Sequence, residues 1–456
     1  SSPDSSPDSS PDSSPDSRRV NNPDSNLAKE SPAQRVMARS VTGTVLEEKE
    51  SWVLQMARVA YWDCRNVNVK HCCNLHDPKP LRNMARWWNN SSSVCLTVES
   101  AVSSGKVNAV SRSIRISLCI ALVSYQFAEA AAAPGAKPRP RDVVKVSPTN
   151  EKIIEGALKY LASKQKPNGS WGENSEERRH PVAITGYTLI AFQSGGNLPG
   201  EGPYGKHVKK GMDYLLNVMG PDGIYGAHAS GQYMYGHGIA TIALGELYGQ
   251  TQSKAIRPKL ERAIKLIIAS QNSQGGWRYR PIVRDADISV TVLQVVALRA
   301  AKNAGIDVPQ RTIDNAVKYV KACYNSSSGG FGYQPGSGPG FARTAAAIYS
   351  LQVCGLYEDP LVLKGSKYLE GNHHNSHQWY VYGNFYATPA QYMIGGKTWE
   401  KWYKIIADTI VKDVKKQGTI YYWDQHRRGG VGPIYTTSVY TTMLAMPYHY
   451  IPLYQR

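Results

Sequence analysis

Apolar residues recur at helical spacing along most of the chain beyond residue 146, in pairs of segments with contrasting patterns. The first segment of a pair carries one apolar stripe on a polar helix, as around Ile153, Ala157 and Leu161. The second is apolar on nearly every side and rich in small residues, which is typical of a helix enclosed by neighbours. We expect these inner helices at 182–192, 238–247, 288–301, 344–353, 386–394 and 437–446.

A Gly-rich turn with an aromatic marker joins the two segments of each pair, and this turn repeats. The clear markers are Trp171, Tyr225, Trp277 and Phe331, and weaker copies contain Trp379 and Trp423. One helical hairpin of this kind cannot bury both of its faces, whereas six hairpins closed in a ring can. The sequence therefore predicts an all-α fold over residues 148–456, an α6/α6 toroid of six helical hairpins.

Two of the turns fit a known motif. The segments QKPNGSW (165–171) and QNSQGGW (271–277) resemble the QW repeat of squalene and other triterpene cyclases, whose repeat family includes the β subunits of protein prenyltransferases. The resemblance covers roughly residues 146–456 and implies the α6/α6 toroid, but it does not specify an activity. The motif is expected to be structural, with Gln satisfying backbone groups at an outer-helix end and the aromatic ring packing against the next repeat.

Two aspartates, Asp285 and Asp287, stand at the start of the third inner helix. They resemble the Asp-X-Asp-Asp motif of class II terpene cyclases, in which the residue matching Asp287 protonates an alkene or epoxide. The resemblance implies that Asp287 is the catalytic acid and that Asp285 is the second carboxylate, which disfavours ionisation of its neighbour. Ile288 replaces the third aspartate of the motif.

A structural role for Asp287 is the alternative. The residue is placed to act as an N-cap that accepts from the amide of Ser289 or Val290, and a helix N-terminus favours a carboxylate. The nearby side chains of Arg278, Arg280 and Arg284 act in the same direction.

The aromatic composition favours a polar guest in the ring. The chain has 29 Tyr and 10 Trp but 5 Phe, and phenol groups can hydrogen-bond a ligand while their rings stack on it. Packing inside the ring is the alternative for each ring-facing residue. The expected substrate-binding residues are Tyr233, Tyr235, His237, Trp277, Arg278, Tyr382, Tyr386, Gln391 and Tyr435.

Three functions are compatible with these patterns. The first is an exported enzyme of terpenoid cyclase or prenyltransferase type that acts on an isoprenoid by acid-initiated chemistry. The second is a polysaccharide lyase or hydrolase in which a pair such as Tyr235 and His237 serves as acid and base. The third is a non-catalytic toroid that binds a small-molecule or glycan ligand or serves as a scaffold.

The sequence suggests neither a cofactor nor a metal site. Cys323 and Cys354 do not stand in the Asp-X-Cys arrangement that the prenyltransferase resemblance would imply for zinc. The histidines His373, His374 and His377 lie in a polar loop, where solvated side chains are expected. Cys323 and Cys354 could pair in an oxidising compartment or remain packed thiols.

The chain before the toroid resembles no globular domain. An SSPD repeat fills Ser1–Ser17 and no sustained period follows as far as residue 105, so we expect disorder. Residues 106–132 have the layout of a signal peptide, with Arg112 and Arg115 before an apolar run at 116–123, and 133–147 would be a linker. We therefore predict that the protein is exported, that translation starts near Val107 or Val110, and that the preceding residues are spurious or removed. Tryptic peptides from 68–82 in the native mature protein would contradict this prediction. A genuine disordered extension with a buried helix at 114–127 is the alternative.

Basic residues dominate the predicted mature chain. Residues 131–456 hold 38 Lys and Arg and 22 Asp and Glu, and the difference, 38 − 22, is +16. Because these charges are dispersed, we expect a solvated face rather than nucleic-acid binding, and the excess is compatible with association with an anionic cell-envelope surface. The sequence implies no particular protein partner.

Overall fold

The computed structural model describes residues 143–226, 233–373, 379–424 and 431–454. The predictions for 1–132, for most of the linker at 133–147 and for His374 and His377 lie outside these residues. Within them, every helix is too short or too polar to cross a membrane.

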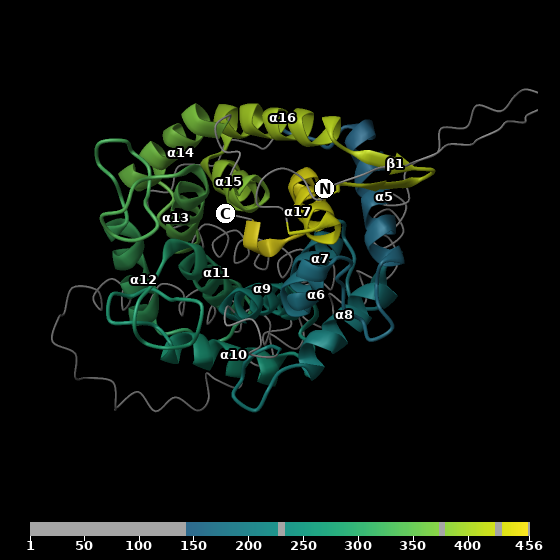
Figure 1. Ribbon diagram of the computed structural model, residues 1–456, viewed down its shortest axis with the longest axis horizontal. Helices are drawn as coiled ribbons and strands as arrows, with labels where there is room; N and C mark the ends of the chain where they lie inside the picture. Colours follow the sequence, from purple (N-terminus) through teal and green to yellow (C-terminus); the bar gives the residue numbers. More distant parts are fainter. Residues whose placement is uncertain (1–142, 227–232, 374–378, 425–430, 455–456) are drawn as a thin grey trace, which may run out of the picture. The chain divides into compact units, whose positions relative to one another are not determined.

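Twelve helices in the described residues form six outer–inner pairs (Figure 1). The pairs are α5 (Pro148–Ser163) with α7 (Pro181–Ser194), α8 (Gly205–Asn217) with α9 (Tyr233–Thr251), α10 (Arg257–Ala269) with α11 (Ile288–Asn303), α12 (Gln310–Ala322) with α13 (Phe341–Val353), α14 (Pro360–Asn372) with α15 (Tyr380–Ile394), and α16 (Gly396–Lys412) with α17 (Pro433–Leu444). The predicted α6/α6 toroid is confirmed. Helices α9 and α15 begin five or six residues before the predicted starts, because their Tyr-rich first turns continue the helix.

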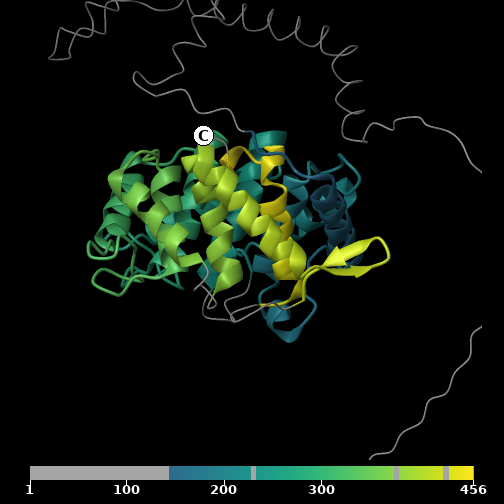
Figure 2. The same cartoon turned by 90° about the horizontal axis from the view of Figure 1, so that it is seen from above.

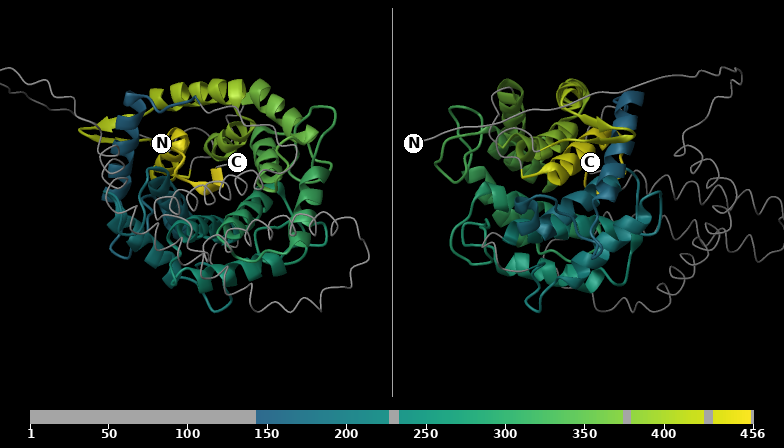
Figure 3. Two further views of the ribbon diagram at one scale, coloured as in Figure 1. Left: turned by 180° about the vertical axis from the view of Figure 1, so that it is seen from behind. Right: turned by 45° about the vertical axis from the view of Figure 1, so that its right-hand side comes forward.

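The inner helices pack side by side around the ring, and contacts between α17 and α7 close it (Figures 1 and 3). Closure also depends on the short helix α6 (Ser175–Arg179). The buried carboxylate of Glu177 in α6 accepts hydrogen bonds from the backbone N–H of Tyr435 in α17, at 3.0 Å, and of Glu173, at 2.8 Å. A buried carboxylate thus joins the first hairpin to the last inner helix.

A small antiparallel hairpin departs from the all-α prediction. Its strands are β1 (Lys415–Gln417) and β2 (Ile420–Tyr422), and it projects from the edge of the ring in Figure 2. Strand β2 packs on α5, where the ring of Tyr422 stacks on that of Tyr160 with centroids 4.9 Å apart. The hairpin therefore adds a further contact between the last repeat and the first.

The segments 165–171 and 271–277 make hydrogen bonds that fit the structural role expected for them. In each, the indole N–H donates to a carbonyl in the last turn of the outer helix, from Trp171 to Leu161 O and from Trp277 to Ile267 O, both at 2.7 Å. Gln271 Nε2 donates to Gly275 O and to Thr312 O of the next outer helix, both at 2.9 Å. The hydrogen bonds of Gln271 therefore connect the end of one outer helix to the start of the next.

Trp379 does not behave as the marker of the fifth repeat. The markers Trp171, Tyr225, Trp277, Phe331 and Trp423 are at most 1 % exposed, whereas Trp379 is 52 % exposed. It precedes α15 with a left-handed backbone, at φ 61°. Its prediction as a packed marker was wrong, because its side chain lies outside the core.

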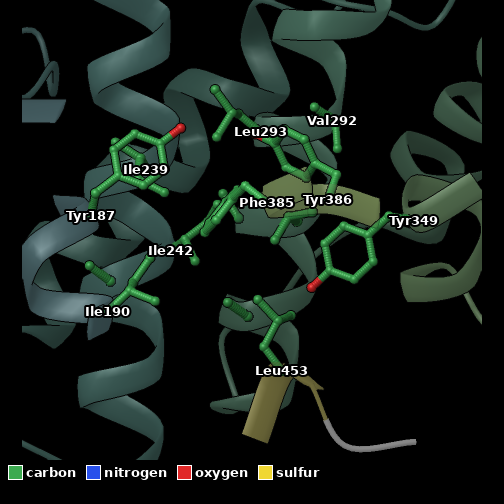
Figure 4. Packing of buried hydrophobic residues seen from close by; sticks show 14 of the residues in the cluster. Tyr187, Ile190, Ile239, Ile242, Val292, Leu293, Tyr349, Phe385, Tyr386 and Leu453 are labelled. Carbon is green, nitrogen blue, oxygen red and sulfur yellow. The ribbon is translucent and has the colours of Figure 1, made fainter. Parts of the chain in front are cut away.

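The C-terminal segment lies against the inner helices. The 3-10 turn η5 (Pro452–Tyr454) contacts α9, α11 and α15, and Leu453 and Tyr454 are buried. Leu453 N–H donates to Glu246 Oε2 at 3.0 Å, and Figure 4 shows Leu453 beside the central aromatic rings. The segment Pro452–Tyr454 therefore fills part of the ring's interior. Cys323 and Cys354 are both free thiols.

Candidate functional site

The starts of inner helices meet at one end of the ring, which we call the mouth. The backbone N–H of Met234, at the start of α9, donates to Tyr279 O at 3.1 Å, and the N–H of Ile288, at the start of α11, donates to Tyr333 O at 3.0 Å. The phenol of Tyr382, in the first turn of α15, donates to Ser289 O at 3.0 Å. The side chains gathered there form the mouth cluster, defined as Tyr235, Arg278, Tyr279, Asp285, Asp287, Tyr333 and Tyr382.

Asp287 is the N-cap of α11. Its Oδ1 accepts from the N–H groups of Ser289 at 2.8 Å and Val290 at 3.0 Å, and the side chain is fully buried. Its Oδ2 lies 3.3 Å from Nη1 of Arg278. The N-cap and ion-pair interpretation is confirmed, and both oxygens of the carboxylate face cationic or N–H groups.

Arg278 links the two aspartates. Its Nε lies 3.2 Å from Asp285 Oδ2, and its guanidinium carbon lies 4.6 Å from the ring centroid of Tyr279 and 5.4 Å from that of Tyr333. A planar guanidinium can stack on aromatic faces while it pairs with carboxylates, which fixes its orientation. The Arg278 side chain is 25 % exposed and that of Asp285 is 60 % exposed, so this network reaches solvent.

Two opposing effects act on the pKa of Asp287. Burial raises the pKa, whereas the backbone N–H groups and the Arg278 guanidinium lower it, and the net direction is upward because burial is the larger effect. An acid that protonates an alkene must hold a proton. The backbone N–H groups and the Arg278 guanidinium stabilise the carboxylate of Asp287 without fully offsetting burial, which favours the protonated form.

Four phenols of the cluster stand at the boundary with solvent. Tyr235, Tyr279, Tyr333 and Tyr382 are half-buried, and the hydroxyls of Tyr279 and Tyr333 hydrogen-bond each other. The rings of Tyr235 and Tyr279 lie 5.8 Å apart. The rings of Tyr279 and Tyr333 therefore flank the Arg278 guanidinium, and their half-buried phenol groups stand beside it at the boundary with solvent.

Further aromatic rings fill the centre of the toroid behind the cluster. Tyr382 meets Tyr386 edge to face at 5.0 Å, Phe385 meets Tyr187 at 5.1 Å, and Tyr187 meets Tyr435 at 4.9 Å. Figure 4 shows Phe385 between Tyr187 and Tyr386, among the buried apolar side chains. Tyr386 and Tyr435, which the sequence suggested as ligand contacts, are buried in this packed group.

His237 faces the outer helix rather than the mouth cluster. Its Nδ1 accepts from Tyr225 N–H at 3.5 Å, and its Nε2 lies 3.3 Å from Ala263 O. The equivalent N–H in the neighbouring repeats donates to a threonine, as from Trp277 to Thr291 Oγ1 at 3.1 Å. Burial lowers the pKa of His237 to about 4. The expected Tyr235–His237 acid–base pair is not formed, because both ring nitrogens of His237 are engaged by backbone groups.

Three other predicted residues also lie outside the cluster. Trp277 is buried and bonded to Ile267 O, as described above. Gln391 is buried and bonds Ser366, accepting from its hydroxyl at 2.6 Å and donating to its carbonyl at 3.2 Å, which ties α15 to α14. Tyr233 is half-buried at the first position of α9. Of the predicted residues, the structure brings together Asp285, Asp287, Arg278, Tyr235 and Tyr382.

Tyr279 and Tyr333 were missed by the sequence reasoning. Each stands two residues after a marker, Trp277 or Phe331, and its carbonyl caps the start of the preceding inner helix. This repeated aromatic at the second position after the marker was the available signal. Among the described residues, no group of three or more His, Cys, Asp or Glu side chains is placed to hold a metal ion.

Neither a family model nor a curated protein sequence matches this chain. Similar solved structures include an inactive variant of the α-1,6-mannanase GH76A of Salegentibacter with bound α-1,6-mannotriose, at 9 % identity, covering 66 % of this chain and 99 % of that one, with a TM-score of 0.49. The cellobiose 2-epimerase from Bacillus thermoamylovorans is 11 % identical, covers 66 % of this chain and 100 % of its own, and has a TM-score of 0.49. A D-mannose isomerase is 11 % identical, covers 67 % of this chain and 99 % of its own, and has a TM-score of 0.47. None of these three is a terpenoid cyclase or prenyltransferase. Because the identities and TM-scores are this low, these structures say nothing about the activity of this protein.

Proposed function

We propose that this toroid binds a polyhydroxylated ligand of the glycan class at the mouth cluster. The observation that carries the proposal is the set of half-buried phenols around the Arg278–Asp285–Asp287 network. A sugar offers hydroxyls that both donate and accept, together with C–H faces that pack on aromatic rings. Phenols, a guanidinium and an exposed carboxylate provide the matching groups.

An isoprenoid ligand fits the same residues less well. Its hydrocarbon chain would cover the charges of Arg278 and Asp285 without replacing their hydration, and burying charged groups without partners is costly. Acid-initiated chemistry at Asp287 remains the second candidate, because burial raises the pKa of this carboxyl and aromatic rings lie behind it. The hydrolase or lyase alternative shares the ligand class with the main proposal and adds turnover to it.

Titration calorimetry of the full chain tests the proposal. The titrants are cellohexaose, α-mannohexaose and farnesol in detergent micelles, and product analysis by mass spectrometry reports turnover separately. We expect a hexasaccharide to bind. Tyr333→Phe, which removes one phenol hydroxyl, should weaken that binding by roughly tenfold, equivalent to about 1.4 kcal/mol. Tyr368→Phe, on outer helix α14, is the matched control and should bind normally. Binding of farnesol alone would overturn the proposal in favour of the second candidate.

Export remains part of the proposed function. It is supported by the signal-like pattern at 106–132, and an extracytoplasmic toroid would meet glycans in the cell envelope. The dispersed excess of basic residues is compatible with association with an anionic envelope surface.

A further inference from the structure

We infer that Trp379 is the outer stacking platform of the mouth, on which one sugar ring of the ligand lies. This inference rests on the proposed function and extends it to a residue beyond the mouth cluster. Three observations support it: the position of Trp379 at the ring's mouth, its exposure, and its backbone conformation.

The position of Trp379 follows from its place before α15. Its carbonyl accepts from Gly383 N–H at 2.7 Å, so the residue is fixed to the first turn of the helix. Tyr382, three residues later, reaches Ser289 O beside Asp287. Since a helix rises about 1.5 Å per residue, Trp379 lies about one turn outward from Tyr382, on the solvent side of the cluster.

The exposure of Trp379 sets it apart from the other tryptophans of the toroid. Trp171, Trp277, Trp399, Trp402 and Trp423 are at most 2 % exposed, whereas Trp379 is 52 % exposed. An exposed indole offers a wide apolar face together with one N–H donor, which are the groups that can stack on a sugar ring and bond its hydroxyls. Here the exposed ring belongs to the residue that precedes α15, the helix whose first turn contributes Tyr382 to the mouth cluster.

The backbone of Trp379 is in a conformation that a bulky residue rarely adopts. Its φ is 61°, in the left-handed region where glycine or asparagine would be favoured. Neither burial nor a role as repeat marker accounts for tryptophan at this position. Strained residues concentrate at ligand sites, where function outweighs the local cost.

Trp379→Gly separates a binding role from a structural one. Glycine relieves the left-handed strain and removes the indole, so we expect a higher denaturant midpoint together with at least a tenfold loss of affinity for cellohexaose or α-mannohexaose. Trp379→Ala should lose affinity equally without the gain in stability. Leu363→Ala is the control, because Leu363 is an exposed apolar residue, 44 % accessible, on outer helix α14.

The outcomes distinguish this inference from the proposal on which it rests. If the wild type binds a hexasaccharide and both Trp379 variants bind it equally well, the stacking platform is wrong while the glycan site stands. If the wild type binds neither hexasaccharide, both are overturned. Loss of affinity in Leu363→Ala as well would also overturn the specific role of Trp379.

Discussion

Asp287→Ala should destabilise the protein by about 3 kcal/mol, whereas Asp287→Asn, which keeps the cap but also loses the ion pair, should cost roughly two-thirds as much. Alanine removes the N-cap of α11, which is worth about 1 kcal/mol. It also leaves Arg278 Nη1 without the buried carboxylate, and breaking a buried ion pair commonly costs more than losing a cap. Asparagine keeps an oxygen that can accept from Ser289 and Val290 N–H. Urea unfolding at pH 7 measures both differences.

Asp285→Asn is the matched control, because Asp285 pairs with the same arginine but is 60 % exposed. Exposed pairs contribute little, so its change should stay below about 0.5 kcal/mol. Equal losses for Asp285→Asn and Asp287→Ala would contradict the ranking by burial. Turnover of an isoprenoid that is lost in Asp287→Asn, while ligand binding and folding persist, would restore Asp287 as the catalytic acid.

The ring could be predicted from the sequence because each repeat is defined by interactions between residues that are close together in the chain. A marker such as Trp171 or Trp277 bonds a carbonyl ten residues earlier, and the following inner helix is apolar all round. The aromatic marker and the apolar inner helix can both be recognised in one sequence alone. Closure of the ring was harder to predict, since the contact between Glu177 and Tyr435 joins residues 258 positions apart.

The site was predictable only where its residues share one segment. Arg278, Asp285 and Asp287 stand within ten positions, and their interaction follows from that proximity. Tyr333 belongs to the next repeat and reaches the cluster because its carbonyl bonds the start of α11. Its place two residues after the marker Phe331 singles it out in the sequence, but does not show which helix it contacts. His237 misled the sequence analysis because histidine suggests chemistry, whereas here it takes the place that threonine occupies in other repeats.

The stability of the toroid should fall as pH rises from about 4.5 to 7, because of Glu246. Burial raises the pKa of this carboxyl from its ordinary value of 4.5 to about 7. In that window the unfolded chain loses the proton while the folded protein retains it, so ionisation favours unfolding. The pKa difference, 7 − 4.5, is 2.5 units, which at about 1.36 kcal/mol per unit corresponds to a loss of about 3 kcal/mol, complete above pH 7.

Glu246→Gln isolates this contribution. Glutamine can still accept from Leu453 N–H but carries no proton that titrates, so the variant should lack the Glu246 share of the pH dependence. The comparison is the difference in unfolding free energy between wild type and variant, measured in urea at pH 5, 6, 7 and 8, in which all other groups cancel. Glu261→Gln, an exposed carboxylate paired with Arg257 at 2.9 Å, should follow the wild type. A wild type and a Glu246→Gln variant with parallel pH profiles would show that the carboxyl of Glu246 is solvated, and that the C-terminal segment does not seal it inside the ring.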